Sequence, residues 1–184
     1  MERKPIFPFY QAWEKGLGDE GWTIINGRAK NMIIVSACLA GVNCKYNGGN
    51  SLNKEVERLV AEGKAVLVCP EQLGGCRTPR SPMEIQEGNG AEVLLGTCKV
   101  ETKDGEDATE EFLKGAREVL NIANMTGCRQ AILKARSPSC GCGEIYDGTF
   151  TGILRDGNGV TAELLLQNGI EVMTELEGEK LKTL

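Results

Sequence analysis

Cysteine is the residue type with the most chemical potential in this chain, because its 184 residues include eight cysteines and no histidine. Cys38, Cys69 and Cys140 each lie just beyond a short apolar run. Without histidine, the chain lacks the commonest neutral metal ligand and the usual acid/base near neutral pH. A metal would be held by thiolates or carboxylates, and thiolates from separate segments suit zinc or an iron–sulfur cluster. Three thiolates on a four-iron cluster would leave one iron without a protein ligand.

The spacing of the cysteines argues against a small metal-nucleated domain. No pair has the C-x-x-C spacing of a zinc ribbon, a thioredoxin-type motif or a bacterial ferredoxin. Cys38 and Cys44 are separated by five residues, and Cys140 and Cys142 by one. Ligands would therefore come from distant segments that the fold brings together, which favours a preformed enzymatic site.

The N-terminus indicates a cytosolic protein with reduced thiols. It has no continuous apolar region and no cleavage signal, and no stretch approaches the roughly 18 apolar residues of a membrane span. Cysteines in such a protein are more often ligands or catalytic groups than disulfides. A free cysteine is also a common small core residue, and we assign that packing role to Cys98 and Cys128. The sequence leaves open the roles of Cys44, Cys76 and Cys142.

Two polar residues lie close to these cysteines. Glu71 follows Cys69 across Pro70, whose fixed φ stiffens the turn. A carboxylate there can be a metal ligand, a general base or a charge that caps a helix. Ser137 begins the Ser-Pro-Ser-Cys-Gly turn around Cys140. Its hydroxyl can bond a cluster sulfur or a polar substrate, or simply stabilise the turn.

The formal net charge of −5 argues against a broad phosphate-binding surface. A local basic cluster remains open, because Arg77, Arg80 and Arg136 flank the cysteine segments. The alternative for these arginines is solvated surface or ion pairs.

Apolar runs and helical spacing predict alternating strands and helices. We expect strands at residues 32–37, 65–68, 130–133 and 170–174, and helices at residues 52–62, 107–124 and 160–167. We also expect an antiparallel ribbon at 91–96 and 98–102, and loops at 71–85 and 137–152.

This order predicts a single compact α/β domain, whose mostly parallel sheet is covered by helices on both faces. We place it at residues 31–176, after an N-terminal extension (1–30, with a short helix near 11–15) and before a C-terminal tail (177–184). Ligands bind such sheets beyond the carboxyl ends of the strands. Cys38, Cys69 and Cys140 follow different predicted strands, so we expect them to share one site.

Several ordered motifs between residues 32 and 175 closely resemble the thiouracil desulfidases of bacteria and archaea. They are SACLAGVNCKYNG, CPEQLGG-x-RTPR, Asp-x-Thr-x-x-Phe, LKARSPSCG, IYDGTF and GVTAELL. The resemblance implies a compact α/β fold and a [4Fe–4S] cluster bound by three cysteines, which correspond to Cys38, Cys69 and Cys140. The fourth iron would be open and act as a Lewis acid on a thione sulfur.

The chemistry implied is non-redox replacement of sulfur by water on a thiolated pyrimidine, with release of sulfide. Glu71 matches the family's proton-handling carboxylate, and Ser137 matches its catalytic serine. The chain departs from the family pattern at Asn47, where an acid is frequent, at Cys76, where an apolar residue is expected, and at Cys142. Free thiouracil, thiouridine in tRNA and other thiolated metabolites share this chemistry, and the acidic charge argues against tRNA as the sole partner.

Two other classes of protein remain open on the sequence. One is an iron–sulfur or sulfide carrier that hydrolyses nothing, and the other is a zinc-binding structural protein. An iron–sulfur absorption band would exclude zinc, and release of sulfide from 2-thiouracil would separate an enzyme from a carrier.

Overall fold

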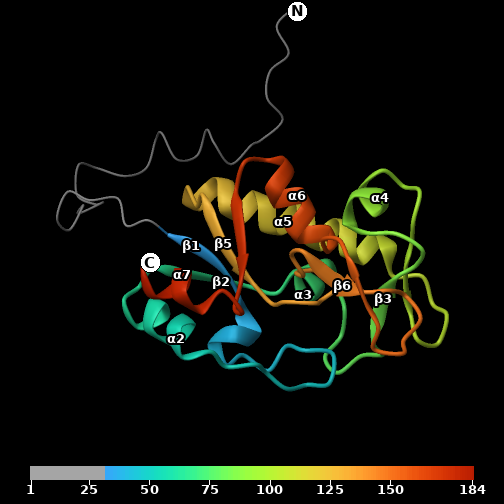
Figure 1. The fold of residues 1–184 in the computed structure, drawn as a ribbon, viewed down its shortest axis with the longest axis horizontal. Helices are drawn as coiled ribbons and strands as arrows, with labels where there is room; N and C mark the ends of the chain where they lie inside the picture. Colours follow the sequence, from blue (N-terminus) through green and yellow to red (C-terminus); the bar gives the residue numbers. More distant parts are fainter. Residues whose placement is uncertain (1–31) are drawn as a thin grey trace, which may run out of the picture. The chain divides into compact units, whose positions relative to one another are not determined.

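The computed structural model describes residues 32–184. The predicted N-terminal extension and its short helix lie outside the described residues. At the centre of the described part is a four-stranded sheet in the order β2-β1-β5-β8 (Figure 1). The strands are β1 (Ile33–Ser36), β2 (Ala65–Val68), β5 (Gln130–Leu133) and β8 (Glu171–Thr174), and each neighbouring pair is parallel. Within residues 32–184, no helix has the length and apolarity needed to cross a membrane.

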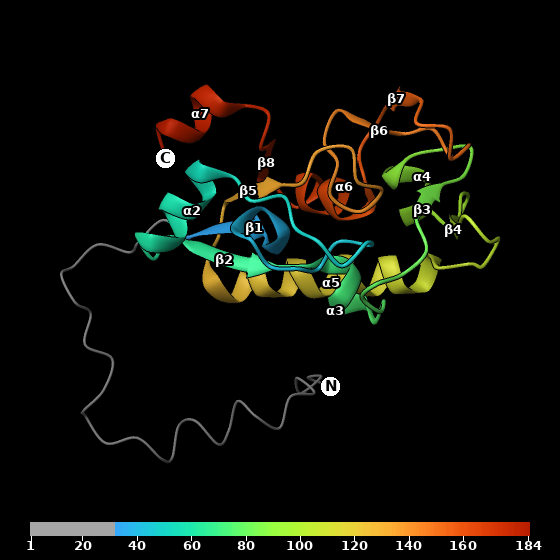
Figure 2. The same ribbon diagram turned by 90° about the horizontal axis from the view of Figure 1, so that it is seen from below.

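Helices cover both faces of this sheet, as the alternation of side chains along a strand requires. Ile33 and Val35 pack in one apolar cluster with side chains of α2 (Lys54–Ala61) and α7 (Gly178–Lys182). Ile34 faces the opposite side and packs with α5 (Thr109–Thr126) and α6 (Val160–Gln167). Figure 2 shows α2 and α7 on one side of the sheet and α5 on the other. The predicted α/β class with a parallel sheet is confirmed.

The connections between strands create the place where a ligand is expected. From β1 the chain moves outward to β2, then returns to the other side of β1 to form β5 and β8. The strand order therefore reverses between β1 and β5, and parallel sheets bind ligands at such a switch point. A 3₁₀ turn, η1 (Ala37–Ala40), follows β1, and the short helix α3 (Pro70–Gly74) follows β2.

The predicted ribbon is wrong in one of its two strands. Residues 91–96 lie mainly in a helix, α4 (Gly90–Leu94), because Asn89 and Glu92 form a capping box. The Asn89 side chain accepts from the Ala91 N–H at 2.8 Å, and the Glu92 carboxylate accepts from the Asn89 N–H at 2.7 Å. The strand β4 (Val100–Thr102) pairs instead with β3 (Met83–Ile85), inside a segment expected to be loop.

Three other short elements also differ from the expectation. The helix α3 lies in the predicted 71–85 loop, and α7 lies in the predicted C-terminal tail. The second predicted loop contains the first strand of an antiparallel hairpin, β6 (Glu144–Tyr146) and β7 (Leu154–Asp156). Each has five residues or fewer, too few to show a clear hydrophobic period.

Candidate functional site

One cavity of about 100 Å³ lies at the carboxyl ends of β1, β2 and β5. Its lining includes all five residues singled out from the sequence: Cys38, Cys69, Glu71, Ser137 and Cys140. It also includes four residues whose roles the sequence left open or did not raise: Ser36, Cys44, Arg80 and Lys134. The cavity therefore combines thiols, a carboxylate, hydroxyls and cations.

The ends of two strands place the first two thiols. Cys38 lies in η1, which ends at Gly41 with a φ of 90°, a left-handed conformation that glycine adopts readily. Cys69 is the residue before α3, and Pro70 occupies the first position of that helix. Proline suits this position because the first helical N–H has no partner within the helix. Glu71 thus stands in the first turn of α3, beside Cys69.

The turn after β5 places the third thiol. The Ser137 hydroxyl oxygen accepts from the backbone N–H groups of Ser139 and Cys140, both at 3.2 Å. The Gly141 N–H donates to the Ser137 carbonyl at 2.8 Å and closes the turn. Cys140 is only 5% exposed, and its burial raises the pKa of its thiol to about 12.

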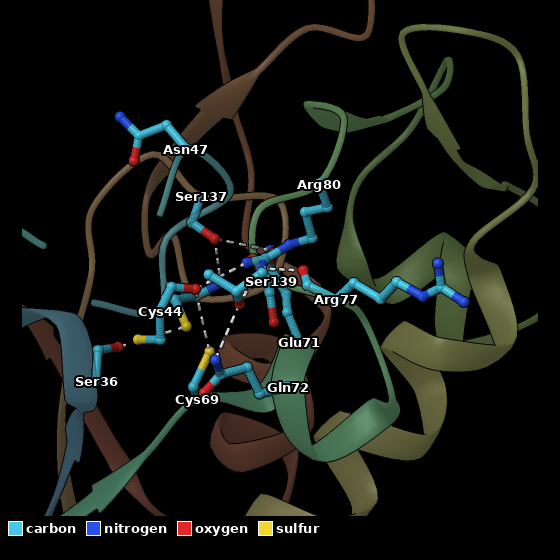
Figure 3. Close-up of polar contacts among 12 residues, drawn as sticks. Ser36, Cys44, Asn47, Cys69, Glu71, Gln72, Arg77, Arg80, Ser137 and Ser139 are labelled. Atoms are coloured by element: carbon cyan, nitrogen blue, oxygen red, sulfur yellow. Dashed lines mark hydrogen bonds and ion pairs between the residues drawn. The ribbon is translucent and has the colours of Figure 1, made fainter. Parts of the chain in front are cut away.

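Ser36 is a site residue that the sequence reasoning missed. It is the last residue of β1, and its hydroxyl donates to the Cys140 sulfur at 3.4 Å and accepts from the Lys134 N–H at 3.0 Å (Figure 3). The hydrogen bond from Ser36 favours the Cys140 thiolate and opposes the effect of burial on its pKa. A small polar residue at the end of an otherwise apolar run was the available signal.

Cys44 brings a fourth thiol to the cavity. Its hydrogen bond with Cys38 is the main cause that raises the Cys44 pKa to about 11. The hydrogen bond with Cys44, followed by burial, also raises the pKa of Cys69. The Cys69 thiol donates to the Cys44 carbonyl at 3.9 Å. Cys44 thus lies between two of the predicted ligands.

Glu71 and Arg80 form a largely buried ion pair beside these thiols. Their side chains are 15% and 8% exposed, respectively. The Arg80 Nε donates to Glu71 Oε2 at 2.8 Å, and Arg80 Nη2 donates to the same oxygen. Glu71 Oε1 has no partner among residues 32–184 and is not sealed from the cavity. One oxygen of the carboxylate is thus held, while the other is open to a ligand.

The remaining cysteines do not line this cavity. Cys128 is buried and Cys142 is half-buried in the cluster with α5 and α6. Cys76 and Cys98 are half-buried against the apolar cluster around β3 and β4. Burial is the main cause that raises the Cys76 pKa to about 11, and the charge of Glu71 adds to it.

The donor set fits a polynuclear cluster better than a single ion. Among residues 32–184, no three Cys, Asp or Glu side chains are grouped closely enough to hold one metal ion together. In an iron–sulfur cluster each cysteine binds a different iron, so the thiols need only surround a common space. Thiols from the segments after β1, β2 and β5 surround such a space here.

Comparisons with known proteins agree with this geometry. A family model described as 2-thiouracil desulfurase matches residues 33–177. The uncharacterized protein YbbK of Bacillus subtilis (strain 168) is 50% identical over 146 residues, which are 79% of this chain and 97% of YbbK. A solved structure of a [4Fe–4S]-dependent thiouracil desulfidase, TudS, is 41% identical with a TM-score of 0.74, over 84% of this chain and 97% of that chain.

Proposed function

This chain belongs to the 2-thiouracil desulfurase family, and we propose that it is a [4Fe–4S]-dependent enzyme that converts a thiolated pyrimidine such as 2-thiouracil into the oxo compound and sulfide. The observation that carries this proposal is the arrangement of Cys38, Cys69 and Cys140 around the cavity that Glu71 and Ser137 also line. Thiols, a carboxylate and a hydroxyl are the groups that such a reaction needs, and they meet at the switch point of the sheet.

Cys38, Cys69 and Cys140 would hold the cluster and leave one iron without a protein ligand. When bound, the cluster supplies a soft Lewis acid, which favours a thione sulfur over oxygen and draws electron density from the ring carbon. The Ser36 hydroxyl already donates to the Cys140 sulfur. Such a hydrogen bond stabilises a thiolate in its deprotonated, ligating form.

Glu71 is placed to handle the protons. The reaction replaces C=S by C=O: water supplies the oxygen, its two protons leave with the sulfur as hydrogen sulfide, and no electrons are transferred. Glu71 Oε1 can accept the first proton as water attacks the ring carbon and then return it to the departing sulfur. The chain contains no histidine to perform this step.

Ser137 is placed to orient the ring. Its oxygen accepts two backbone N–H bonds, while its hydroxyl hydrogen has no acceptor among residues 32–184. A serine hydroxyl has one hydrogen to donate. That hydrogen can therefore bond a ring nitrogen or the exocyclic atom of a bound pyrimidine.

Cys44 favours one competing function. If it bound the fourth iron, all the irons would have protein ligands, and the protein would be an iron–sulfur or sulfide carrier without hydrolytic activity. Replacing Cys44 by serine distinguishes the two functions. With three cysteine ligands the variant keeps its full iron content, whereas with four it loses iron or cluster stability.

The direct test is turnover by the anaerobically reconstituted protein. We expect 2-thiouracil to yield uracil and sulfide in equal amounts, measured by chromatography and a colorimetric sulfide assay. The apo protein is the control, and it should release none. A fully loaded protein that releases no sulfide from 2-thiouracil, 4-thiouracil or thiouridine would support the carrier instead.

A further inference from the structure

Arg80 lines the cavity but has no part in the chemistry described above. Its side chain is 8% exposed, and burying a charge is costly unless every polar atom finds a partner. We propose that Arg80 is a positioning residue, which fixes the Glu71 carboxylate so that its second oxygen faces the substrate. This inference rests on the proposed function of Glu71 as the group that handles protons.

The hydrogen bonds of Arg80 account for all of its donors. A guanidinium has five N–H donors. Nε and one Nη2 hydrogen go to Glu71 Oε2, and the other Nη2 hydrogen goes to the Cys44 carbonyl at 3.2 Å. Nη1 donates to the Arg77 carbonyl at 3.0 Å and to the Thr78 hydroxyl at 3.2 Å. No donor remains for a substrate, so Arg80 acts through the groups that it holds.

These contacts join three segments of the chain. Glu71 lies in α3, the Cys44 carbonyl lies in the loop after η1, and Thr78 belongs to the loop that precedes β3. The Arg80 backbone N–H also donates to the Tyr46 carbonyl at 2.8 Å. The residue therefore fixes Glu71 relative to the loop that carries Cys44. Lysine cannot reproduce this pattern, because its three donors radiate from one nitrogen.

Arg77 provides a matched control within the same RTPR motif. Its side chain is exposed, and its guanidinium has no partner among residues 32–184. In Figure 3 Arg80 reaches toward Glu71, whereas the Arg77 side chain extends away from the site. Two arginines separated by two residues thus differ in the property under test.

The experiment compares R80Q, R80K, R77Q, E71Q and the double variant R80Q/E71Q. We expect R80Q to keep its iron content and its KM for 2-thiouracil but to lose about 10- to 100-fold in kcat, because small misplacements of a reacting group cost that much. R80K should recover only part of the loss, and R77Q should match the unsubstituted protein. In the E71Q background, R80Q should cause no further loss, because Arg80 acts through Glu71.

Thermal unfolding of the apo proteins provides a readout that does not depend on turnover. R80Q and E71Q each leave one buried charge unpaired, so the double variant should unfold at a temperature no lower than either single variant. Equal losses of kcat from R80Q with and without Glu71, or additive unfolding effects, would overturn the positioning role. If the loaded unsubstituted protein does not convert 2-thiouracil, the proposed function fails, and the unfolding data alone decide whether Arg80 holds Glu71.

Discussion

Glu71 and Ser137 share a property that matters at the scale of single residues. Each is fixed by hydrogen bonds at one position and keeps another position free toward the cavity. Arg80 occupies Glu71 Oε2, and the Ser139 and Cys140 N–H groups occupy the Ser137 oxygen. Held groups with one open valence need little reorganisation when a substrate arrives, which is how fixed polar groups accelerate reactions.

Glu71→Gln tests the proton-handling role most directly. Glutamine keeps the shape of the side chain but cannot take up a proton. We expect the variant to keep the cluster absorption and to lose sulfide release by about 10²- to 10⁴-fold, the usual contribution of a positioned acid/base. Steady-state assays at matched iron content measure the loss. Near-normal turnover would reduce Glu71 to a structural charge.

Cys140 and Cys128 form a matched pair for testing ligand assignment. Both are buried, at 5% and 1% exposure, and both belong to the same apolar cluster. Cys140→Ser should abolish or destabilise the cluster, because a hydroxyl is a poor substitute for a thiolate. Cys128→Ala should keep full iron content and lose only about 1 kcal/mol of unfolding free energy. Loss of iron from the Cys128 variant would mean that the ligands have been misassigned.

The sequence predicted which residue types would meet, but not how they would be held. Cys38, Cys69 and Cys140 were identifiable because each follows an apolar run. Ser36 was not, since its bond to Cys140 joins residues 104 positions apart. For the same reason, the sequence could not separate Arg80 from Arg77 or place Cys44 between two other thiols. Burial and distant partners decide these roles, and neither is visible in local spacing.

At the scale of elements, predictions succeeded where the pattern was long or strongly apolar. The strands at 65–68 and 130–133 and the helix at 160–167 have the predicted bounds. The segment 91–96 is apolar enough for a strand, yet the capping box of Asn89 and Glu92 starts a helix there. Short elements such as β3 and β6 depend on their antiparallel partners, which the local sequence does not reveal.

The packing of α3 on α5 gives a prediction at this scale. A Cβ atom at Gly115 would lie 2.0 Å from the Pro70 carbonyl oxygen, and one at Gly74 would lie 2.0 Å from the Glu111 carbonyl oxygen. Alanine normally favours a helix over glycine by about 1 kcal/mol. We expect Gly115→Ala instead to destabilise the protein by about 1–3 kcal/mol, because α3 must move away.

That movement should also impair the site, since α3 carries Glu71 and begins next to Cys69. Denaturant unfolding and iron content of Gly115→Ala measure the two effects. Gly178→Ala is the control, because a Cβ there meets nothing within 4 Å. An unchanged stability and iron content in Gly115→Ala would show that the two helices can adjust without disturbing the site.

For the molecule as a whole, the site exists only when the sheet is assembled. The predicted ligands follow three different strands, and β1 brings their segments together by pairing with β2 and β5. The general rule for parallel sheets therefore located the site from the sequence, although it fixed no contact within it. A cluster bound at this place would link segments that are distant along the chain, so binding and folding should be coupled.

Removal of the cluster should accordingly lower the thermal stability of the protein, and the difference should depend on pH. Burial raises the Cys140 pKa to about 12, and that of Cys69 is raised as well, so both thiols are protonated in the apo protein at neutral pH. Each must lose its proton to bind iron, and this release favours the cluster as pH rises. We expect the gap in Tm between loaded and apo protein to widen from pH 6 to pH 8, measured anaerobically by calorimetry. Cys140→Ser should show no such gap, and equal Tm values for the loaded and apo forms would mean that the cysteines do not join these segments through a cluster.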